Sequence, residues 1–335
     1  MESLDLRVLS DALAWHSAGH AVTLVTVVQT WGSAPRPPGA LLAVRDDGVV
    51  SGSVSGGCVE DDLIARTKAA LETSGRTPNN TKPTVITYGD SKEEAARFGL
   101  PCGGTLRLVQ EPLLDTAWVA QLLARTAAHQ LVARTLTLAT GAVLLASAVR
   151  GQTMQFDGSI LTTVFGPKWR LLLIGAGQLS QAVAQMALML DFEVLVCDPR
   201  EEYAATLIAG MTGIRRIEGM PDDVVRELVP DAHTAIVALT HDPKLDDMAL
   251  LEALQSSAFY VGALGSRRNQ DARKQRLAEH FNLSPDELAR LHGPVGLALG
   301  AKTPAEIAVA IMAEIVQVKN GVLGAAITTT NCALT

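Results

Sequence analysis

The chain has 335 residues, of which 48% are hydrophobic and 19% charged, and its formal net charge is -7. This length suggests two domains, and the acidic balance without a basic patch argues against a nucleic-acid partner. The few, scattered cysteines exclude a disulfide framework, and none has the C-x-x-C spacing of a structural zinc site. Because we find neither a signal-peptide pattern nor an apolar run long enough for a membrane span, we expect a cytoplasmic setting without a membrane partner.

The first third of the sequence predicts a mixed unit of helices and strands. Apolar residues at helical spacing predict helices over residues 5–18 and 59–71, with a shorter helix over 90–97. β-branched runs predict strands over residues 21–30, 40–44, 49–54, 84–88 and 105–109. A loop rich in Pro and Gly between the first two strands carries Arg36, which is either a solvated loop residue or a contact for an anion.

Two cysteines beside glycine pairs stand out in this unit. Gly56 and Gly57 precede Cys58 where a strand ends and a helix begins, and Cys102 precedes a second glycine pair just before a strand. Glycines let a ligand approach the backbone, and a helix N-terminus favours a thiolate, although the three carboxylates that follow Cys58 oppose it. Small buried cysteines in tight turns explain the same pattern, so the residues alone leave both interpretations open.

The middle of the chain continues this pattern up to a domain boundary. We expect a helix over residues 115–129, two strands within 131–150 joined as a hairpin, and one more strand over 156–165. Residues 166–170 contain a Gly-Pro pair and separate these elements from a different pattern, so they mark the best domain boundary in the sequence.

From residue 171 onward, strands and helices alternate, which is typical of a parallel sheet covered on both faces. Gly175 and Gly177 lie between an apolar strand and a helix, and Ser180 takes the place of a third glycine. Asp198 ends the next strand. In a Rossmann fold such glycines form a turn, the helix N-terminus binds phosphate and the acid binds ribose, so we predict that fold here. Further strands are expected over residues 210–217, 234–239 and 258–264, and helices over 269–280 and 305–319.

Polar residues follow several of these strands, at the sheet edge where open α/β folds bind ligands. His241 is either a capped loop residue or an acid/base group. Arg267, at the start of a helix, is either solvated or a contact for an anion. With the two Rossmann glycines and Asp198, His241 would complete an NAD(P)-dependent oxidoreductase, which is one function that this half supports.

Several segments in their order along the chain resemble the XdhC/CoxI family of molybdenum-enzyme accessory proteins. The segments are GSAPRPPG at 32–39, GSVSGGCVE at 52–60, GLPCGG at 99–104, GALGSRR at 262–268, HGPVG at 292–296 and TPAEIA at 303–308. The resemblance covers most of the chain except roughly residues 113–168. The joint order of the segments is much more specific than any one motif.

The resemblance implies a chaperone rather than a turnover enzyme. Its cargo would be molybdenum cofactor, a pterin dithiolene that carries a phosphate or a nucleotide. A cysteine desulfurase would help to make the sulfurated cofactor, and a xanthine dehydrogenase or related molybdenum hydroxylase would receive it. The matching residues imply Cys58 as the contact to cofactor and metal, with Cys102 as a further candidate, and thiolates suit a metal–sulfur centre. We also expect a homo-oligomer, a dimer.

The sequence therefore predicts an α/β chain. We expect an N-terminal α+β XdhC/CoxI-like domain over 1–112, a connecting helix and β-hairpin over 113–168, a Rossmann-like doubly wound parallel sheet over 169–322, and a tail over 323–335. The candidate cofactor-binding residues are Arg36, Gly56, Gly57, Cys58, Cys102, Gly175, Gly177, Asp198, His241 and Arg267. Three functions stay open: a cofactor chaperone, an oxidoreductase with NAD(P) in the Rossmann cleft, and a sulfur carrier with a persulfide at Cys58.

Overall fold

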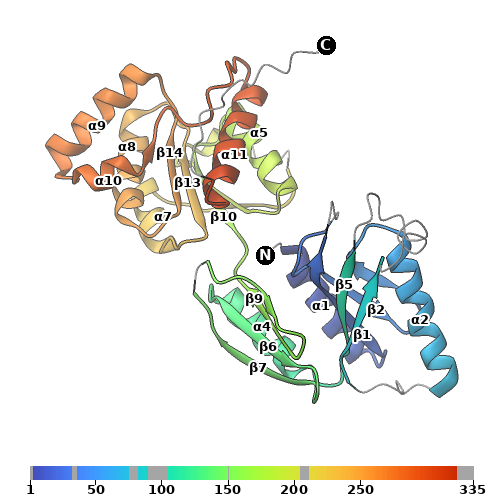
Figure 1. Cartoon of the computed structure of the whole chain (residues 1–335). Helices are drawn as coiled ribbons and strands as arrows, with labels where there is room; N and C mark the ends of the chain where they lie inside the picture. Colours follow the sequence, from blue (N-terminus) through green and yellow to red (C-terminus); the bar gives the residue numbers. More distant parts are fainter. Residues whose placement is uncertain are drawn as a thin grey trace, which may run out of the picture. The chain divides into compact units, whose positions relative to one another are not determined.

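The computed structural model describes residues 3–31, 36–74, 82–89, 105–149, 151–203 and 211–322. The chain forms two compact units, Met1–Lys168 and Trp169–Thr335 (Figure 1). The helix expected over residues 90–97 lies outside the described residues. Among the residues that are described, no helix is both long and apolar enough to cross a lipid bilayer.

A five-stranded antiparallel sheet forms the centre of the first unit. Its strands, in the order β3-β2-β1-β5-β4, are β1 (Val22–Thr30), β2 (Leu41–Arg45), β3 (Val50–Gly52), β4 (Thr84–Tyr88) and β5 (Leu106–Pro112), and its helices are α1 (Ser3–Ser17) and α2 (Cys58–Ser74). Successive strand residues point to opposite faces, so each face of the sheet carries its own helix. Leu24 packs in one core with Val8 of α1, and the next residue, Val25, packs in another with Leu63 of α2.

A four-stranded antiparallel sheet belongs to the same unit. Its strands, in the order β7-β6-β9-β8, are β6 (Val132–Thr137), β7 (Ala142–Ser147), β8 (Gln155–Phe156) and β9 (Ile160–Phe165), and α4 (Ala117–Ala127) lies beside them (Figure 1). The single strand expected over residues 156–165 is thus two short paired strands. The chain turns between them because Asp157 accepts the N–H groups of Ser159 and Ile160 at 2.8 and 2.7 Å.

The two sheets of the first unit are joined by apolar packing and by one buried ion pair. Their common core consists of Val28, Val109, Leu136, Leu138 and Leu161. Arg134 of β6 donates to Glu111 of β5 at 2.6 Å, and its guanidinium lies 4.1 Å from the centre of the Trp118 ring. Since both charged side chains are buried, loss of either would leave an uncompensated charge in the interior.

The second unit is the Rossmann-like sheet that the sequence predicts. Its strands are β10 (Arg170–Ile174), β11 (Glu193–Cys197), β12 (Ile214–Arg216), β13 (Thr234–Ala238), β14 (Tyr260–Ala263) and β15 (Leu291–His292). They are parallel and follow the order β12-β11-β10-β13-β14-β15. The order reverses between β10 and β13, and this fold binds its ligands at the carboxyl ends of strands beside such a reversal.

Helices cover both faces of this sheet, which confirms the predicted doubly wound class. On one face lie α5 (Gln178–Met189) and α11 (Pro304–Lys319), side by side in Figure 1, and on the other lie α7 (Pro221–Leu228), α8 (Pro243–Gln255) and α9 (Arg267–Phe281). Leu171 and Leu173 of β10 face the first group, and Leu172 and Ile174 face the second. The short helix α10 (Pro285–Ala289) and β15 escaped prediction because elements of 5 and 2 residues carry no periodic signal.

Candidate functional site

The first candidate site is the turn between β3 and α2, residues 53–58, which we call the cysteine turn. Gly52 leads into it with φ of +86°, and a Cβ on Gly52 would lie 2.2 Å from the carbonyl oxygen of Leu41. Only glycine therefore fits against β2 at this point. Gly57 ends the turn, and the backbone of Cys58 begins α2.

Glu60, in the first turn of α2, ties the cysteine turn to the helix. Its carboxylate accepts four successive backbone N–H groups, at 2.9, 2.8, 2.9 and 2.8 Å, from Val54, Ser55, Gly56 and Gly57. It also accepts the hydroxyl of Ser53 at 2.8 Å and the hydroxyl of Ser55. The donors of the turn thus converge on one internal anion.

These donors determine the charge of Glu60. Burial raises the pKa of Glu60, but the hydrogen bonds from Ser55, Gly56 and Gly57 outweigh it and lower the pKa to about 2. In the sequence, Glu60 stands out only as one of the three carboxylates that follow Cys58. The missed signal is its spacing, because the third residue after a helix cap is where a glutamate reaches back to the cap N–H.

The other charged residues of the first unit have different partners. Asp62 accepts the hydroxyl of Tyr88 at 2.8 Å and pairs with Arg66 at 2.5 Å. Arg36 is half-buried in the bend before β2, and Cys102 lies outside the described residues, so both stay predictions as cofactor contacts. Within the described ranges, no group of three His, Cys, Asp or Glu residues comes together as a metal site.

The second candidate site is the glycine loop, residues 175–177, between β10 and α5. Gly175 has φ of +107°, and a Cβ on it would lie 3.0 Å from the backbone nitrogen of Thr240 at the end of β13. Gly177 differs, since an added Cβ would meet nothing within 4 Å. Gly177 occupies the cap position of α5, and no side-chain cap hydrogen bond closes this helix terminus. The N–H groups of Gly175 and Ala176 are accepted by Cys197 and Asp198, so it is the terminus of α5, from Gly177 onward, that offers N–H groups of the kind that bind phosphate.

Asp198 ends β11 and faces the glycine loop. Its carboxylate accepts the Ala176 N–H at 2.9 Å and the Arg200 guanidinium at 2.9 and 2.8 Å. Burial raises the pKa of Asp198, but the hydrogen bonds from Arg200 and Ala176 outweigh it and hold the pKa below its usual range. The carboxylate predicted to bind a ribose thus already has a cationic partner. That partner, which was not among the predicted site residues, lies 4.3 Å from the centre of the Tyr203 ring.

His241 follows β13 at the same edge of the sheet. Its backbone has φ of +63°, which is uncommon outside glycine, and the residue is exposed. Thr240, before it, donates its hydroxyl to Asp246 at 2.7 Å, and Asp242, after it, caps α8 by accepting the Lys244 N–H at 2.9 Å. The turn that holds His241 is therefore fixed on both sides, and its acid/base role stays a prediction.

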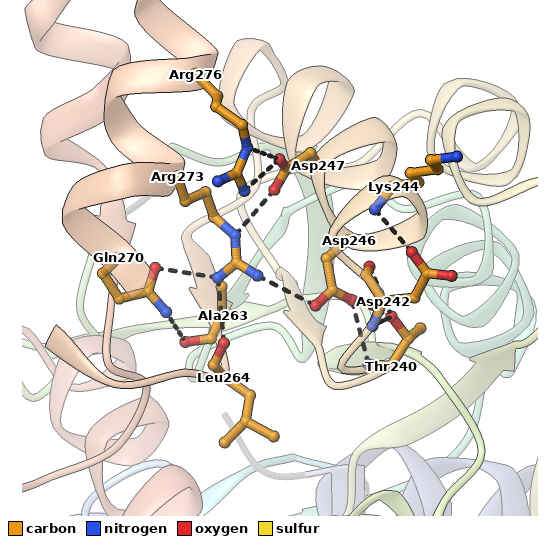
Figure 2. A network of polar contacts seen from close by, with 10 residues as sticks. All are labelled: Thr240, Asp242, Lys244, Asp246, Asp247, Ala263, Leu264, Gln270, Arg273 and Arg276. Carbon is orange, nitrogen blue, oxygen red and sulfur yellow. Dashed lines mark hydrogen bonds and ion pairs between the residues drawn. The ribbon is translucent and has the colours of Figure 1, made fainter. Parts of the chain in front are cut away.

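Figure 2 shows a buried polar network that joins the ends of β13 and β14. Arg273 of α9 donates to Asp246 at 3.2 Å, to Asp247 at 2.9 Å and to the carbonyl oxygen of Leu264 at 3.2 Å. Arg276 donates to Asp247 at 2.9 and 2.7 Å. Because these charges neutralise one another inside the protein, the network serves to fix the two strand-end loops.

Gln270 supports the same network from one turn earlier in α9. It donates to the carbonyl oxygen of Ala263 at 2.9 Å, and its own Oε1 accepts from Arg273 at 3.1 Å. A Cβ on Gly293 would lie 2.5 Å from that Oε1, so a larger residue there would displace the Gln270 amide from the network. The last strand loop is thereby held close to the loop after β14.

Arg267, the predicted anion contact, is the exposed first residue of α9, and it takes no part in the contacts of Figure 2. Arg273, which is 5% exposed, was not among the predicted site residues. The available signal was helical spacing, because Gln270, Arg273 and Leu277 fall on one face and all three are buried. An arginine that is buried on this face needs a charged partner, and Asp246 and Asp247 supply it.

Two segments of the chain match models of known protein families. Residues 171–315 match the family model of the XdhC Rossmann domain, and residues 15–89 match that of the XdhC and CoxI family. The molybdenum cofactor insertion chaperone PaoD of Escherichia coli is 30% identical over 94% of this chain and 87% of its own length. A Bacillus subtilis protein named as a probable xanthine dehydrogenase subunit is 27% identical over 89% of this chain and 93% of its own length.

Two further similarities concern length and fold. The uncharacterized protein YqeB of Escherichia coli is 26% identical over 95% of this chain, but the chain spans only 47% of the length of YqeB. A crystal structure described as a xanthine dehydrogenase from Bacillus halodurans shares the fold, with a TM-score of 0.74 at 22% identity, over 97% of this chain and 98% of that one. Together, the two family matches and the identity with PaoD show that the chain belongs to the XdhC and CoxI family.

Proposed function

We propose that the protein binds molybdenum cofactor, protects it and inserts it into a molybdenum hydroxylase such as a xanthine dehydrogenase. The observation that carries the proposal is the cysteine turn, because a preformed backbone turn leads directly into Cys58 at the start of α2. A thiolate at this position suits the metal–sulfur centre of the cofactor. The name of the relative PaoD, a molybdenum cofactor insertion chaperone, supports the same cargo.

The glycine loop supplies a binding site for a phosphate-bearing ligand. The uncapped terminus of α5 and the cation of Arg200 lie at the carboxyl ends of β10 and β11. The helix terminus favours an anion, which is either the phosphate of the cofactor or that of a nucleotide such as NAD(P). Arg200 lies at the same edge, where it is already paired with Asp198. His241 and Arg267, which follow β13 and β14, are the further candidates for this ligand.

Two finer steps belong to the same proposal. A cysteine desulfurase would supply the sulfur for the sulfurated cofactor, and the loaded protein, a homodimer, would then dock on the client hydroxylase. In a variant of this scheme, Cys58 itself carries the sulfur as a persulfide. The two schemes predict different results when Cys58 is replaced. If Cys58 is a ligand of the cofactor, the variant loses the cofactor. If Cys58 only carries sulfur, the variant keeps the cofactor but does not support its sulfuration.

The test compares two cysteines in protein purified anaerobically from cells that make molybdenum cofactor. We expect the parent protein to contain molybdenum and pterin, measured by metal analysis and mass spectrometry, and Cys58→Ala to retain about tenfold less while staying folded. Cys197 is the matched control, since it is fully buried at the end of β11 and burial raises its pKa to about 12. Cys197→Ala should cost about 1 kcal/mol of stability and leave cofactor retention unchanged.

The other outcomes distinguish the alternatives. Retention of cofactor by Cys58→Ala at the parent level would contradict the ligand role of this cysteine. Retention combined with delivery of only unsulfurated cofactor to the client would favour the sulfur carrier. A melting temperature that falls along with retention would mean that Cys58 is a packing residue of the turn.

A further inference from the structure

The cysteine turn uses its glutamate more extensively than an ordinary helix cap does. Glu287 and Glu306 hold the same third helical position in α10 and α11, in capping boxes with Ser284 and Thr303. Glu287 accepts the backbone N–H and the hydroxyl of Ser284, both at 2.7 Å, and Glu306 accepts the N–H groups of Lys302 and Thr303 at 2.8 and 3.0 Å. Glu60 instead accepts four successive N–H groups and two hydroxyls. Capping α2 requires only the bond from the cap N–H, so the others serve the turn.

In the cysteine turn, the N–H donors and the free space beside the glycines lie on different sides of the backbone. The N–H groups of Gly56 and Gly57 point to Glu60, at 2.9 and 2.8 Å. A Cβ placed on either glycine would meet nothing within 4 Å. The turn therefore directs hydrogen-bond donors inward to the carboxylate and leaves space on the side of the glycine Cα atoms. A ligand that approaches Cys58 along the glycines meets backbone carbon rather than N–H donors.

This arrangement disfavours the turn as a phosphate cradle. A phosphate would have to displace Glu60 from every donor that it needs. It would also bring its own acceptor oxygens against the carboxylate oxygens of Glu60, and two acceptors cannot hydrogen-bond to each other. The turn resembles an anion-binding nest that already contains its anion.

We propose that Glu60 is a positioning residue for the cofactor: it fixes the backbone that presents Cys58, and it excludes the phosphate of the cofactor from the cysteine turn. The inference rests on the proposed function, in which Cys58 contacts the cofactor. It assigns the phosphate to a different part of the protein and leaves the thiol as the contact made by this turn.

The first experiment measures the turn itself in the full-length protein without cofactor. Amide hydrogen exchange of the peptide that contains residues 54–57 should be about tenfold faster in Glu60→Gln, because an amide cannot accept from all four donors at once. Glu287→Gln is the matched control and should leave this peptide unchanged. Glu60→Asp keeps the charge on a shorter side chain and should restore part of the protection. Inorganic phosphate at millimolar concentration should not alter exchange of this peptide in the parent protein.

The second experiment asks whether Glu60 acts through Cys58. Release of molybdenum from loaded protein should be about tenfold faster in Glu60→Gln, as in Cys58→Ala, and no faster in the double variant than in Cys58→Ala alone. A purely structural role would make the two effects multiply. Melting temperatures of all variants show whether any loss merely follows unfolding, and Glu60→Asp provides the test if Glu60→Gln does not fold.

The outcomes separate this inference from the function on which it rests. Faster exchange with parental molybdenum release, multiplying effects in the double variant, or protection of the peptide by inorganic phosphate would overturn the positioning role and leave the chaperone function standing. A parent protein that holds no molybdenum would overturn the proposed function, whatever the exchange data show. Unchanged exchange in a folded Glu60→Gln would refute the carboxylate contacts themselves.

Discussion

The cysteine turn and the glycine loop have the same position between a strand and a helix, but they differ in which groups accept their backbone N–H donors. Each joins the end of a strand to a helix, and each places a glycine, Gly57 or Gly177, directly before the helix. In the first, Glu60 accepts four N–H groups of the turn. In the second, Asp198 accepts only the Ala176 N–H, and no side chain caps the terminus of the helix. The first turn is therefore closed by an internal anion, while the second is open to an external one.

One residue accounts for the difference. The third position of α2 is Glu60, whereas the third position of α5 is Ser180, which is fully buried and too short to reach back to the turn. A pair of glycines before a helix does not by itself indicate a phosphate site. The residue three places after the cap decides whether the donors are already used, and this rule can be read directly from a sequence.

The largest expected effect concerns the stability of the open loop. Gly175→Ala places a Cβ at φ of +107° and 3.0 Å from a backbone nitrogen, so we expect a loss of about 2–3 kcal/mol in the free energy of unfolding. Gly177→Ala, in the same loop, and Gly57→Ala, in the closed turn, add a Cβ that meets nothing within 4 Å. Both controls should unfold like the parent in urea. Equal losses in all three variants would contradict the steric argument.

The next effect concerns the closed turn in acid. The pKa of Glu60 is about 2 in the folded protein against an ordinary value of 4.5, so its contribution to stability is present above pH 4.5 and disappears as the pH falls toward 2. We expect about 2 kcal/mol from this source, after allowance for partial screening by solvent. Urea unfolding between pH 6 and 3 should show a shallower decline for Glu60→Gln than for the parent. Parallel curves for the two proteins would mean that the carboxylate adds no acid sensitivity.

A smaller effect concerns ligand binding at the open loop. Gly177→Val introduces a branched side chain where φ is -79° and the space is free, so the fold should survive. The side chain would obstruct the terminus of α5, and binding of a phosphate-bearing ligand should weaken about tenfold, or ~1.4 kcal/mol. Titrations with NAD(P)H and with molybdenum cofactor measure this. Unchanged binding of both by the folded variant would make the glycine loop a purely structural turn.

The smallest expected effect is the rate of NAD(P)H turnover by the protein. Asp198 is engaged by Arg200, and His241 is the one candidate acid/base group that the sequence indicates. We therefore expect no sustained NAD(P)H turnover with small alcohols, aldehydes or hydroxy acids, measured by nicotinamide absorbance. Turnover that disappears in His241→Ala would give the open loop an enzymatic role and reverse the order of the proposed functions.

The fold was predictable because its signals are local. The glycines of the loop, the apolar strand before them and Asp198 after the next strand lie within a short stretch, and they predict the parallel sheet that the structure contains. The single strand expected over residues 156–165 was wrong, because the turn depends on hydrogen bonds of one aspartate.

The sequence predicted which types of residue lie at the sites, but not which hydrogen-bond and ion-pair partners these residues have. The sequence indicated that Glu60 lies at the start of a helix, but not that four N–H groups converge on it. It indicated an acid at the end of β11, but not that Arg200 pairs with it. Among the arginines of α9 it favoured Arg267, whereas the buried one is Arg273. Each of these contacts depends on the three-dimensional course of a loop, which a local pattern does not specify.

The common core of the two sheets in the first unit has a practical consequence for dividing the protein. A fragment that ended at residue 112 would expose Val28 and Val109 and would remove Arg134 from Glu111. The newly exposed apolar surface would remove stabilising burial and favour association, so such a fragment would unfold or aggregate. A cut after Lys168 severs neither contact. Limited proteolysis should accordingly release a fragment of residues 1–168 that keeps both sheets. Binding of the proposed client enzyme and of the proposed desulfurase can then be measured for each half separately.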